Sequence, residues 1–222
     1  MKKMMKAAAV IAALVMAFSL TGCAFEDENE DKNKTGFVQN LFAIAENGDD
    51  GVITLFAVYS SEIPEDGIVR IPDEVECIRS SAFYGCTNLK EVIIPANVTI
   101  IESSAFMDCT ALNTVTFAAG SKLNFIGSYA FSYCPELKTI EIPDGVTEIF
   151  DYAFGNGGQT VLDNATVPLS VEYIGELAFC NTKEITYKGT KADWDKIQKG
   201  GANPGLQVGA KIIHCTDGDI DI

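Results

Sequence analysis

The chain is dominated by a short motif that recurs at a nearly fixed spacing. An Ala-Phe pair occurs at 82–83, 105–106, 130–131, 153–154 and 178–179, and successive phenylalanines are 23, 25, 23 and 25 residues apart. A unit this short cannot bury its own apolar side chains, so its copies must stack and bury them against one another. The repeat therefore predicts a mainly β solenoid of about five coils of 23–25 residues.

Each copy places apolar residues at the same positions around the Ala-Phe pair. An isoleucine lies five residues before every motif phenylalanine, and a Leu-x-x-Val/Ile-x-Ile/Phe segment follows the pair in the first three copies. We expect this second segment, such as Leu89 to Ile94, to be a strand that pairs with its copies in a parallel sheet, with coils about 4.8 Å apart. The Ile-x-x-x-Ala-Phe segment is expected to form the opposite side as short strands or irregular turns.

The N-terminus has the pattern of an export signal. Lys2, Lys3 and Lys6 precede an apolar stretch from Ala7 to Leu20, which is short for a membrane span. This stretch leads into Thr21-Gly22-Cys23, which resembles a bacterial lipoprotein lipobox. The resemblance implies that 1–22 is a signal peptide and that Cys23 carries lipid. The protein would then be exported and anchored on the outer face of the bacterial cell envelope.

The remaining chain is divided by composition. Residues 23–36 are acidic and poor in apolar side chains, which predicts a disordered tether. Residues 37–70 are expected to be an N-terminal β cap, 71–187 the repeats, and 188–222 a small C-terminal cap with a short helix. In that helix Trp194 should face the last coil, because a repeat stack exposes an apolar surface at its end.

The full pattern Ile-x-x-x-Ala-Phe-x-x-Cys-x-x-Leu-x-x-Val-x-Ile-Pro resembles the BspA-like leucine-rich repeat family of bacterial surface proteins. The resemblance covers about residues 68 to 190, and the segments 187–197 and 214–218 are similar to the terminal segment of that family. It implies a leucine-rich repeat stack displayed at a cell surface. The third copy departs from the pattern, with Ala118-Ala119 in place of proline and two extra residues.

Three cysteines recur at one position of the motif. Cys86, Cys109 and Cys134 each lie three residues after the motif phenylalanine, so they should form a column along the solenoid. We expect this column to be buried and to behave as small apolar residues. Disulfides between coils or a metal site are the alternatives. Equivalent residues point the same way, which is poor geometry for a disulfide, and no Cys-x-x-Cys pair favours zinc.

The sequence offers no residue set for catalysis. His214 is the only histidine, and no phosphate-binding loop, zinc-protease motif or nucleophile elbow is present. We therefore assign no catalytic, cofactor-binding or metal-binding residue and expect a protein that is not an enzyme. The formal charge of −15 argues against nucleic acid as a partner.

Residues that alternate with the buried strand positions should point outward. They form a polar face of mixed charge, and repeat solenoids use such faces for binding. We expect a non-catalytic binding or adhesion module that contacts an extracellular protein or matrix ligand. The alternatives are a structural spacer or assembly protein of the envelope, and a hydrolase. The residues assigned to this face are Lys90, Glu91, Ile93, Asn113, Thr114, Thr116, Lys138, Thr139, Glu141, Asp163, Asn164, Thr166, Lys183, Glu184 and Thr186.

Overall fold

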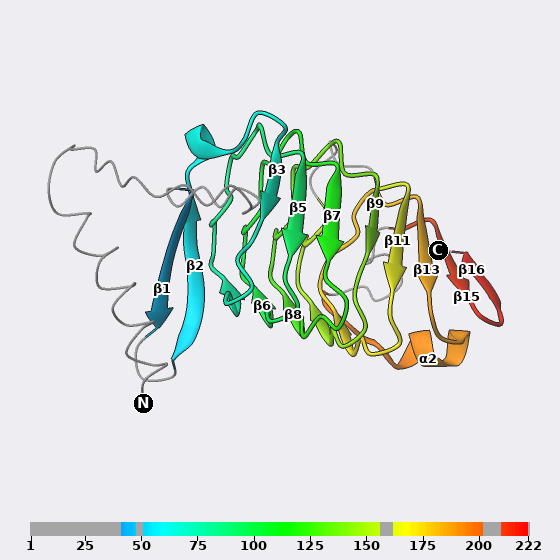
Figure 1. The fold of residues 1–222 in the computed structure, drawn as a ribbon. Coiled ribbons are helices and arrows are strands. Elements are labelled where there is room, and N and C mark those ends of the chain that lie inside the picture. The colour runs from blue at the N-terminus through cyan, green and yellow to red at the C-terminus, as the bar shows by residue number, and fades with distance from the viewer. Residues whose placement is uncertain (1–40, 48–50, 156–161, 202–209, 222) are drawn as a thin grey trace, which may run out of the picture.

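A computed structural model describes residues 41–47, 51–155, 162–201 and 210–221 of the chain. These residues form an elongated stack of coils that runs from β1 at the left to β16 at the right, with strands on two opposite sides (Figure 1). The predicted signal peptide, Cys23 and the acidic tether lie outside the described residues. No helix among the described residues is long and apolar enough to cross a membrane.

The described elements are mostly short strands. The helices are η2 (Ser60–Glu62), a single 3₁₀ turn, and α2 (Lys191–Lys196). The strands are β1 (Phe42–Asn47), β2 (Val52–Val58), β3 (Ile68–Arg70), β4 (Cys77–Ile78), β5 (Glu91–Ile94), β6 (Ile100–Ile101), β7 (Thr114–Phe117), β8 (Phe125–Ile126), β9 (Thr139–Glu141), β10 (Glu148–Ile149), β11 (Asn164–Val167), β12 (Tyr173–Ile174), β13 (Glu184–Tyr187), β14 (Gln198–Lys199), β15 (Ile212–Cys215) and β16 (Gly218–Asp221).

The two sides of the solenoid differ in continuity. One side is a single sheet in the order β1-β2-β4-β6-β8-β10-β12-β14, parallel from β2 onward. The other side, which we call the strand face, consists of a three-stranded sheet, β3-β5-β7, and a five-stranded sheet, β9-β11-β13-β15-β16. The solenoid with parallel strands is confirmed, but the strand face is divided, and the single continuous sheet expected there is not formed.

The motif phenylalanines form the centre of the stack. Phe83, Phe106, Phe131, Phe154 and Phe179 are at most 1% exposed. Their ring centroids are 4.5, 4.9, 5.4 and 5.3 Å apart along the stack, and the rings are nearly parallel. The isoleucine and leucine positions of the motif are equally buried around them. One apolar core therefore runs from coil to coil, as the repeat requires.

Both ends of the stack are closed. At the N-terminal end β1 and β2 pair in antiparallel fashion, and Leu55 is fully buried against the first coil. At the C-terminal end Thr190 caps α2 through a reciprocal pair of hydrogen bonds with Asp193. Trp194, which is 4% exposed, packs edge-on against Tyr187 with ring centroids 5.2 Å apart. The expected short helix and the inward position of its tryptophan are confirmed.

Two corners of each coil hold residues with left-handed backbone. The first lies two residues before the motif phenylalanine, where the five residues have φ between 51° and 61°: Ser81, Ser104, Tyr129, Tyr152 and Leu177. The second lies two residues after it, at Gly85, Asp108, Tyr133 and Asn181 in the described copies. Only glycine adopts this conformation without strain. The sequence motif does not mark these corners, because the residue types there vary.

Gly85 allows this strain to be measured in isolation. Its φ is +69°, and a Cβ added there would meet no atom within 4 Å, so substitution adds backbone strain without a clash. We expect Gly85→Ala to lower the free energy of unfolding by about 1 kcal/mol in chemical denaturation. Gly85→Asn should cost less, since asparagine tolerates left-handed backbone. Equal costs for the two variants would contradict this explanation.

Candidate functional site

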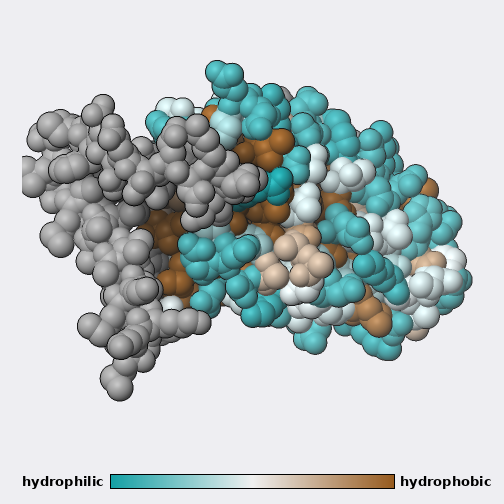
Figure 2. Space-filling model, in the orientation of Figure 1, coloured by the Kyte–Doolittle hydropathy of each residue, from teal (hydrophilic) through white to brown (hydrophobic). Residues whose placement is uncertain are grey.

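The strand face carries all fifteen residues that the sequence assigns to a binding surface. They lie on β5, β7, β9, β11 and β13 or immediately before these strands (Figure 1). Eleven are exposed, and Glu91, Ile93, Asn164 and Thr166 are half-buried. The intervening inward residues are buried on every strand except β7. In the view of Figure 2 the face is mostly hydrophilic, with apolar surface visible mainly toward its β3–β7 half.

Several of these side chains form an ion pair or a hydrogen bond with a side chain of the neighbouring coil. Lys183 Nζ lies 2.6 Å from Asp163 Oδ1, and Asn164 Nδ2 donates to Thr186 Oγ1 at 2.9 Å. The hydrogen bond and charge of Lys183 hold the pKa of Asp163 below its usual range. Both groups are exposed, so the pair adds little stability. It links the segments immediately before β11 and β13 in neighbouring coils.

The strand face opens between β7 and β9. The connection from the strand face to the opposite sheet differs in length between coils. It spans seven residues from Ile94 to Ile101 and from Ile142 to Ile149. From Phe117 to Ile126 it spans nine residues. The two extra residues lengthen the loop after β7, and β7 does not pair with β9. On the opposite side β6, β8 and β10 remain paired. The opening is therefore a wedge rather than a break through the stack.

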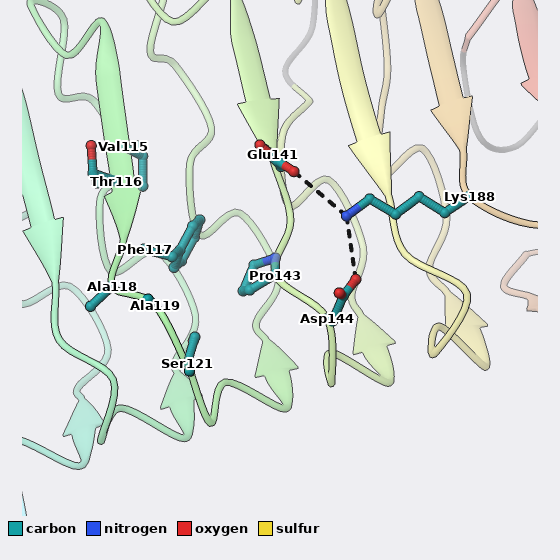
Figure 3. A pocket seen from close by; sticks show the side chains of 11 residues that line it. Val115, Thr116, Phe117, Ala118, Ala119, Ser121, Glu141, Pro143, Asp144 and Lys188 are labelled. Atoms are coloured by element: carbon teal, nitrogen blue, oxygen red, sulfur yellow. Dashed lines mark hydrogen bonds and ion pairs between the residues drawn. The ribbon is translucent and has the colours of Figure 1, made fainter.

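The wedge exposes part of the core. Val115 and Phe117 of β7 are half-buried, whereas the equivalent Val92 and Ile94 of β5 are fully buried. A cavity of about 600 Å³ lies at the C-terminal ends of β7 and β9. Residues 115–121 line one side of it, and Glu141, Pro143, Asp144 and Lys188 line the other (Figure 3).

A lysine from the fifth coil crosses the rim of this cavity. Lys188 follows β13, and its Nζ lies 3.5 Å from Glu141 Oε1 and 3.3 Å from Asp144 Oδ1 (Figure 3). The single ammonium group of Lys188 pairs with two carboxylates, so the three side chains together carry a net negative charge. The two carboxylate side chains are 75% and 82% exposed, so these ion pairs are weak and can rearrange at little cost.

The cysteine column is buried, as expected. Cys86, Cys109 and Cys134 are at most 1% exposed, and all three are free thiols. Cys109 Sγ donates to the carbonyl of Phe83 at 3.1 Å, which satisfies the thiol within the stack. Burial raises the pKa of Cys86 to about 11 and that of Cys134 to about 12. These thiols are consequently poor nucleophiles at neutral pH.

The C-terminal end of the strand face holds His214. It lies on β15, where its Nδ1 is 2.8 Å from Asp219 Oδ1 and its Nε2 is 3.5 Å from Glu184 Oε2. The contact with Asp219 is the main cause of a raised His214 pKa, and Glu184 adds to it. Among the described residues no group of three His, Cys, Asp or Glu side chains is arranged to hold a metal ion.

The titration of His214 tests this arrangement directly, because the chain contains one histidine. We expect its imidazole signals in NMR to titrate above the ordinary pKa of 6.5. The stabilisation from protonated His214 is then present below about pH 6.5 and is lost as the pH rises through the raised pKa. Asp219→Asn should lower the midpoint, whereas Asp221→Asn on the same strand should not. Equal shifts in both variants would contradict a specific pair.

Part of the candidate site was missed in the sequence. Asp144 and Lys188 lie outside the strand segments from which the face was predicted, and Val115 and Phe117 were expected to be core. The available signal was the irregular third copy, with its two extra residues and missing proline. That signal marks an altered loop, but it does not say which side of the coil opens.

Comparisons with known proteins agree with this architecture. The family model described as "BspA type Leucine rich repeat region" matches residues 61–186 in six copies. Among solved structures, a leucine rich cell surface protein from Faecalibacterium prausnitzii A2-165 is 32% identical with a TM-score of 0.64. The match covers 73% of this chain and 42% of that protein, so this chain spans less than half of its length.

A second solved structure shows the same fold. The T. pallidum leucine rich repeat protein is 24% identical with a TM-score of 0.59, and the match covers 78% of this chain and 84% of that one. Among curated proteins no sequence matches the chain significantly. The family model matches more than half of the chain and coincides with the coils described above. The chain therefore belongs to the BspA-type leucine-rich repeat family.

Proposed function

We propose that the protein is a non-catalytic module of a bacterial cell surface that binds an extracellular protein or matrix ligand on its strand face. Membership in a leucine-rich repeat family supports a protein-binding scaffold. A similar solved structure is described as a cell surface protein, which supports the location. A rigid repeat stack presents a continuous surface to a partner without a large ordering cost.

The wedge is the observation that carries the proposal. Binding energy at protein interfaces concentrates where an apolar group enters a pocket surrounded by polar contacts. Val115 and Phe117 provide such an apolar floor on a face that is otherwise polar. Glu141, Asp144 and Lys188 provide charged groups at its rim. We therefore place the centre of the binding surface at the wedge and its polar periphery on the neighbouring strands.

The N-terminal segment supplies the proposed attachment. Signal peptide 1–22 would be removed, Cys23 would carry lipid, and the acidic segment 23–36 would separate the anchor from the fold. The proposed caps, 37–70 and 188–222, then enclose the repeats 71–187. This organisation would hold the strand face outside the membrane, where an extracellular partner could reach it.

Lipid attachment is tested by Cys23→Ser. We expect the variant to lose incorporation of a labelled fatty acid and to move from the membrane to the soluble fraction, because the thiol is the lipid acceptor. Cys215→Ser, which leaves the lipobox unchanged, should remain in the membrane fraction. Membrane retention and labelling of Cys23→Ser would contradict the anchor.

Partner binding is tested by placing a photo-crosslinking amino acid at single positions. Thr116 on β7 and Ser103 after β6 belong to the same coil and are both exposed, but they lie on opposite sides of the solenoid. At the cell surface we expect a discrete crosslinked partner from position 116 and not from 103. Charge reversal at Lys138, Glu141, Lys183 and Glu184 should weaken that crosslink. Equal crosslinking from both positions would reject the strand face, and no crosslink from position 116 would favour a structural spacer.

A further inference from the structure

The side opposite the strand face carries a row of aromatic side chains. In the eight-stranded sheet the isoleucines of β8, β10 and β12 are fully buried, so their neighbours in each strand point outward. Phe125 and Tyr173 occupy such outward positions. Phe150, directly after β10, lies between them, with ring centroids 4.7 Å from Phe125 and 5.2 Å from Tyr173.

A second pair of rings lies one corner further along the same coils. Tyr129 and Tyr152 stack with centroids 5.1 Å apart and an interplanar angle of 2°. Tyr129 is 39% exposed, and Phe125, Phe150, Tyr152 and Tyr173 are half-buried. We call these five side chains the aromatic row. They span the third, fourth and fifth coils and are distinct from the buried phenylalanine stack.

Two glycines lie beside the middle of the aromatic row, where the backbones of neighbouring coils approach closely. Gly127 and Gly175 hold the positions equivalent to Phe150 in the adjacent coils. A Cβ at Gly127 would lie 2.6 Å from Ser103 N, and one at Gly175 would collide with Asp151 N, so neither position accepts a side chain without a backbone shift. The adjacent coils therefore place no side chain at the position equivalent to Phe150, and its ring neighbours are Phe125 and Tyr173.

Carboxylates lie among these rings. Glu148 is in register with both Phe125 and Tyr173, so it lies between them on the outer surface. Asp151 follows Phe150, and its Oδ1 accepts a hydrogen bond from the Glu176 amide at 2.7 Å. The pKa of Tyr173 is raised, mainly by burial and further by the negative charges of Asp151 and Glu148. This agrees with carboxylates close to its ring.

The negative charge here is not balanced by neighbours. The segments 124–133, 147–155 and 172–180 contain Glu148, Asp151, Glu172 and Glu176 and no Lys, Arg or His. None of these four carboxylates forms an ion pair with a described residue. Lys199 on the adjacent β14 is turned away, since its Nζ donates to the carbonyls of Trp194 at 2.7 Å and Ile197 at 2.9 Å.

We propose that the aromatic row and its carboxylates form a second interaction surface, which binds an extended basic segment of a partner protein. Arginine or lysine side chains would lie over the rings and reach the carboxylates between them. This chemistry differs from that of the strand face, where Lys183 and Lys188 already pair with neighbouring acids. The overall charge of −15 would attract such a segment.

A basic segment fits this surface better than a neutral sugar does. The rings of Phe125, Phe150 and Tyr173 are tilted by 38° and 52° to one another, so they offer no continuous flat platform for a sugar chain. A neutral ligand would also cover Glu148 and Asp151 without compensating their charge, which carries a desolvation cost. A cation uses the ring faces and the carboxylates together.

The experiment measures binding of a fluorescein-labelled peptide of alternating arginine and threonine to the purified full-length protein by anisotropy. Threonine favours the extended backbone. We expect Glu148→Gln with Glu176→Gln to weaken affinity about fivefold and Tyr129→Ala about threefold, since each removes contacts to the peptide. Asp73→Asn with Glu74→Gln, an equal charge change on an exposed turn, should change it less than about twofold. Thermal melts establish that each variant is folded.

Three outcomes would overturn the proposal. The first is no binding of the arginine peptide, or equal binding of a matched glutamate-threonine peptide. The second is equal weakening by the Asp73 and Glu74 control, which would show attraction by net charge alone. The third is binding of a neutral glucan oligosaccharide that Tyr129→Ala abolishes, with no such effect on the peptide, which would assign the row to carbohydrate. None of these outcomes depends on the strand face, so that proposal is tested separately.

Discussion

The structure depends on one interaction that joins each coil to the next. The amides of the first four motif phenylalanines each donate to the carbonyl of the motif alanine in the following coil, at 2.7 Å for Phe83, Phe106 and Phe131 and 2.8 Å for Phe154. These hydrogen bonds hold the coils at the spacing at which the five phenylalanine rings stack. The backbone ladder and the apolar core thus require the same separation. Every motif alanine is at most 3% exposed, so a longer side chain there would have to enter the packed core.

The left-handed corners follow from this ladder. At the first corner, successive amides alternate between two kinds of acceptor. One amide donates to a carbonyl of the next coil, as Phe83 N does to Ala105 O. The following amide donates to a carbonyl of its own turn, as Tyr84 N does to Ser81 O. A chain can alternate in this way only if it turns sharply, and residues such as Tyr152 and Leu177 accept positive φ to do so. Their strain is offset by the hydrogen bonds and ring contacts of the stack, which no single coil could form alone.

The same ladder explains why the wedge opens on one side. Two additional residues after β7 fall in the loop between the strand face and the opposite sheet. The motif corner keeps its register, because the phenylalanine stack and its hydrogen bonds continue through Phe106 and Phe131. The mismatch is therefore absorbed on the strand face, where β7 and β9 separate and partly expose Val115 and Phe117. An irregularity in the repeat thereby produces a distinct cavity on the strand face.

The repeat alone determined the solenoid, its parallel strands and the residues in its core, because a unit of fixed length can bury its apolar positions only against its own copies. The same periodicity identified the outward positions of the strand face, such as Thr116 and Glu141, and the capping role of Trp194. Only the tertiary structure decided that the strand face divides, and that Lys188 reaches Asp144 across 44 residues of sequence. It also placed Glu148 in register with Phe125 and Tyr173 of the neighbouring strands. These features depend on the register between neighbouring coils, which is set by backbone pairing and corner geometry rather than by the residue types of any one copy.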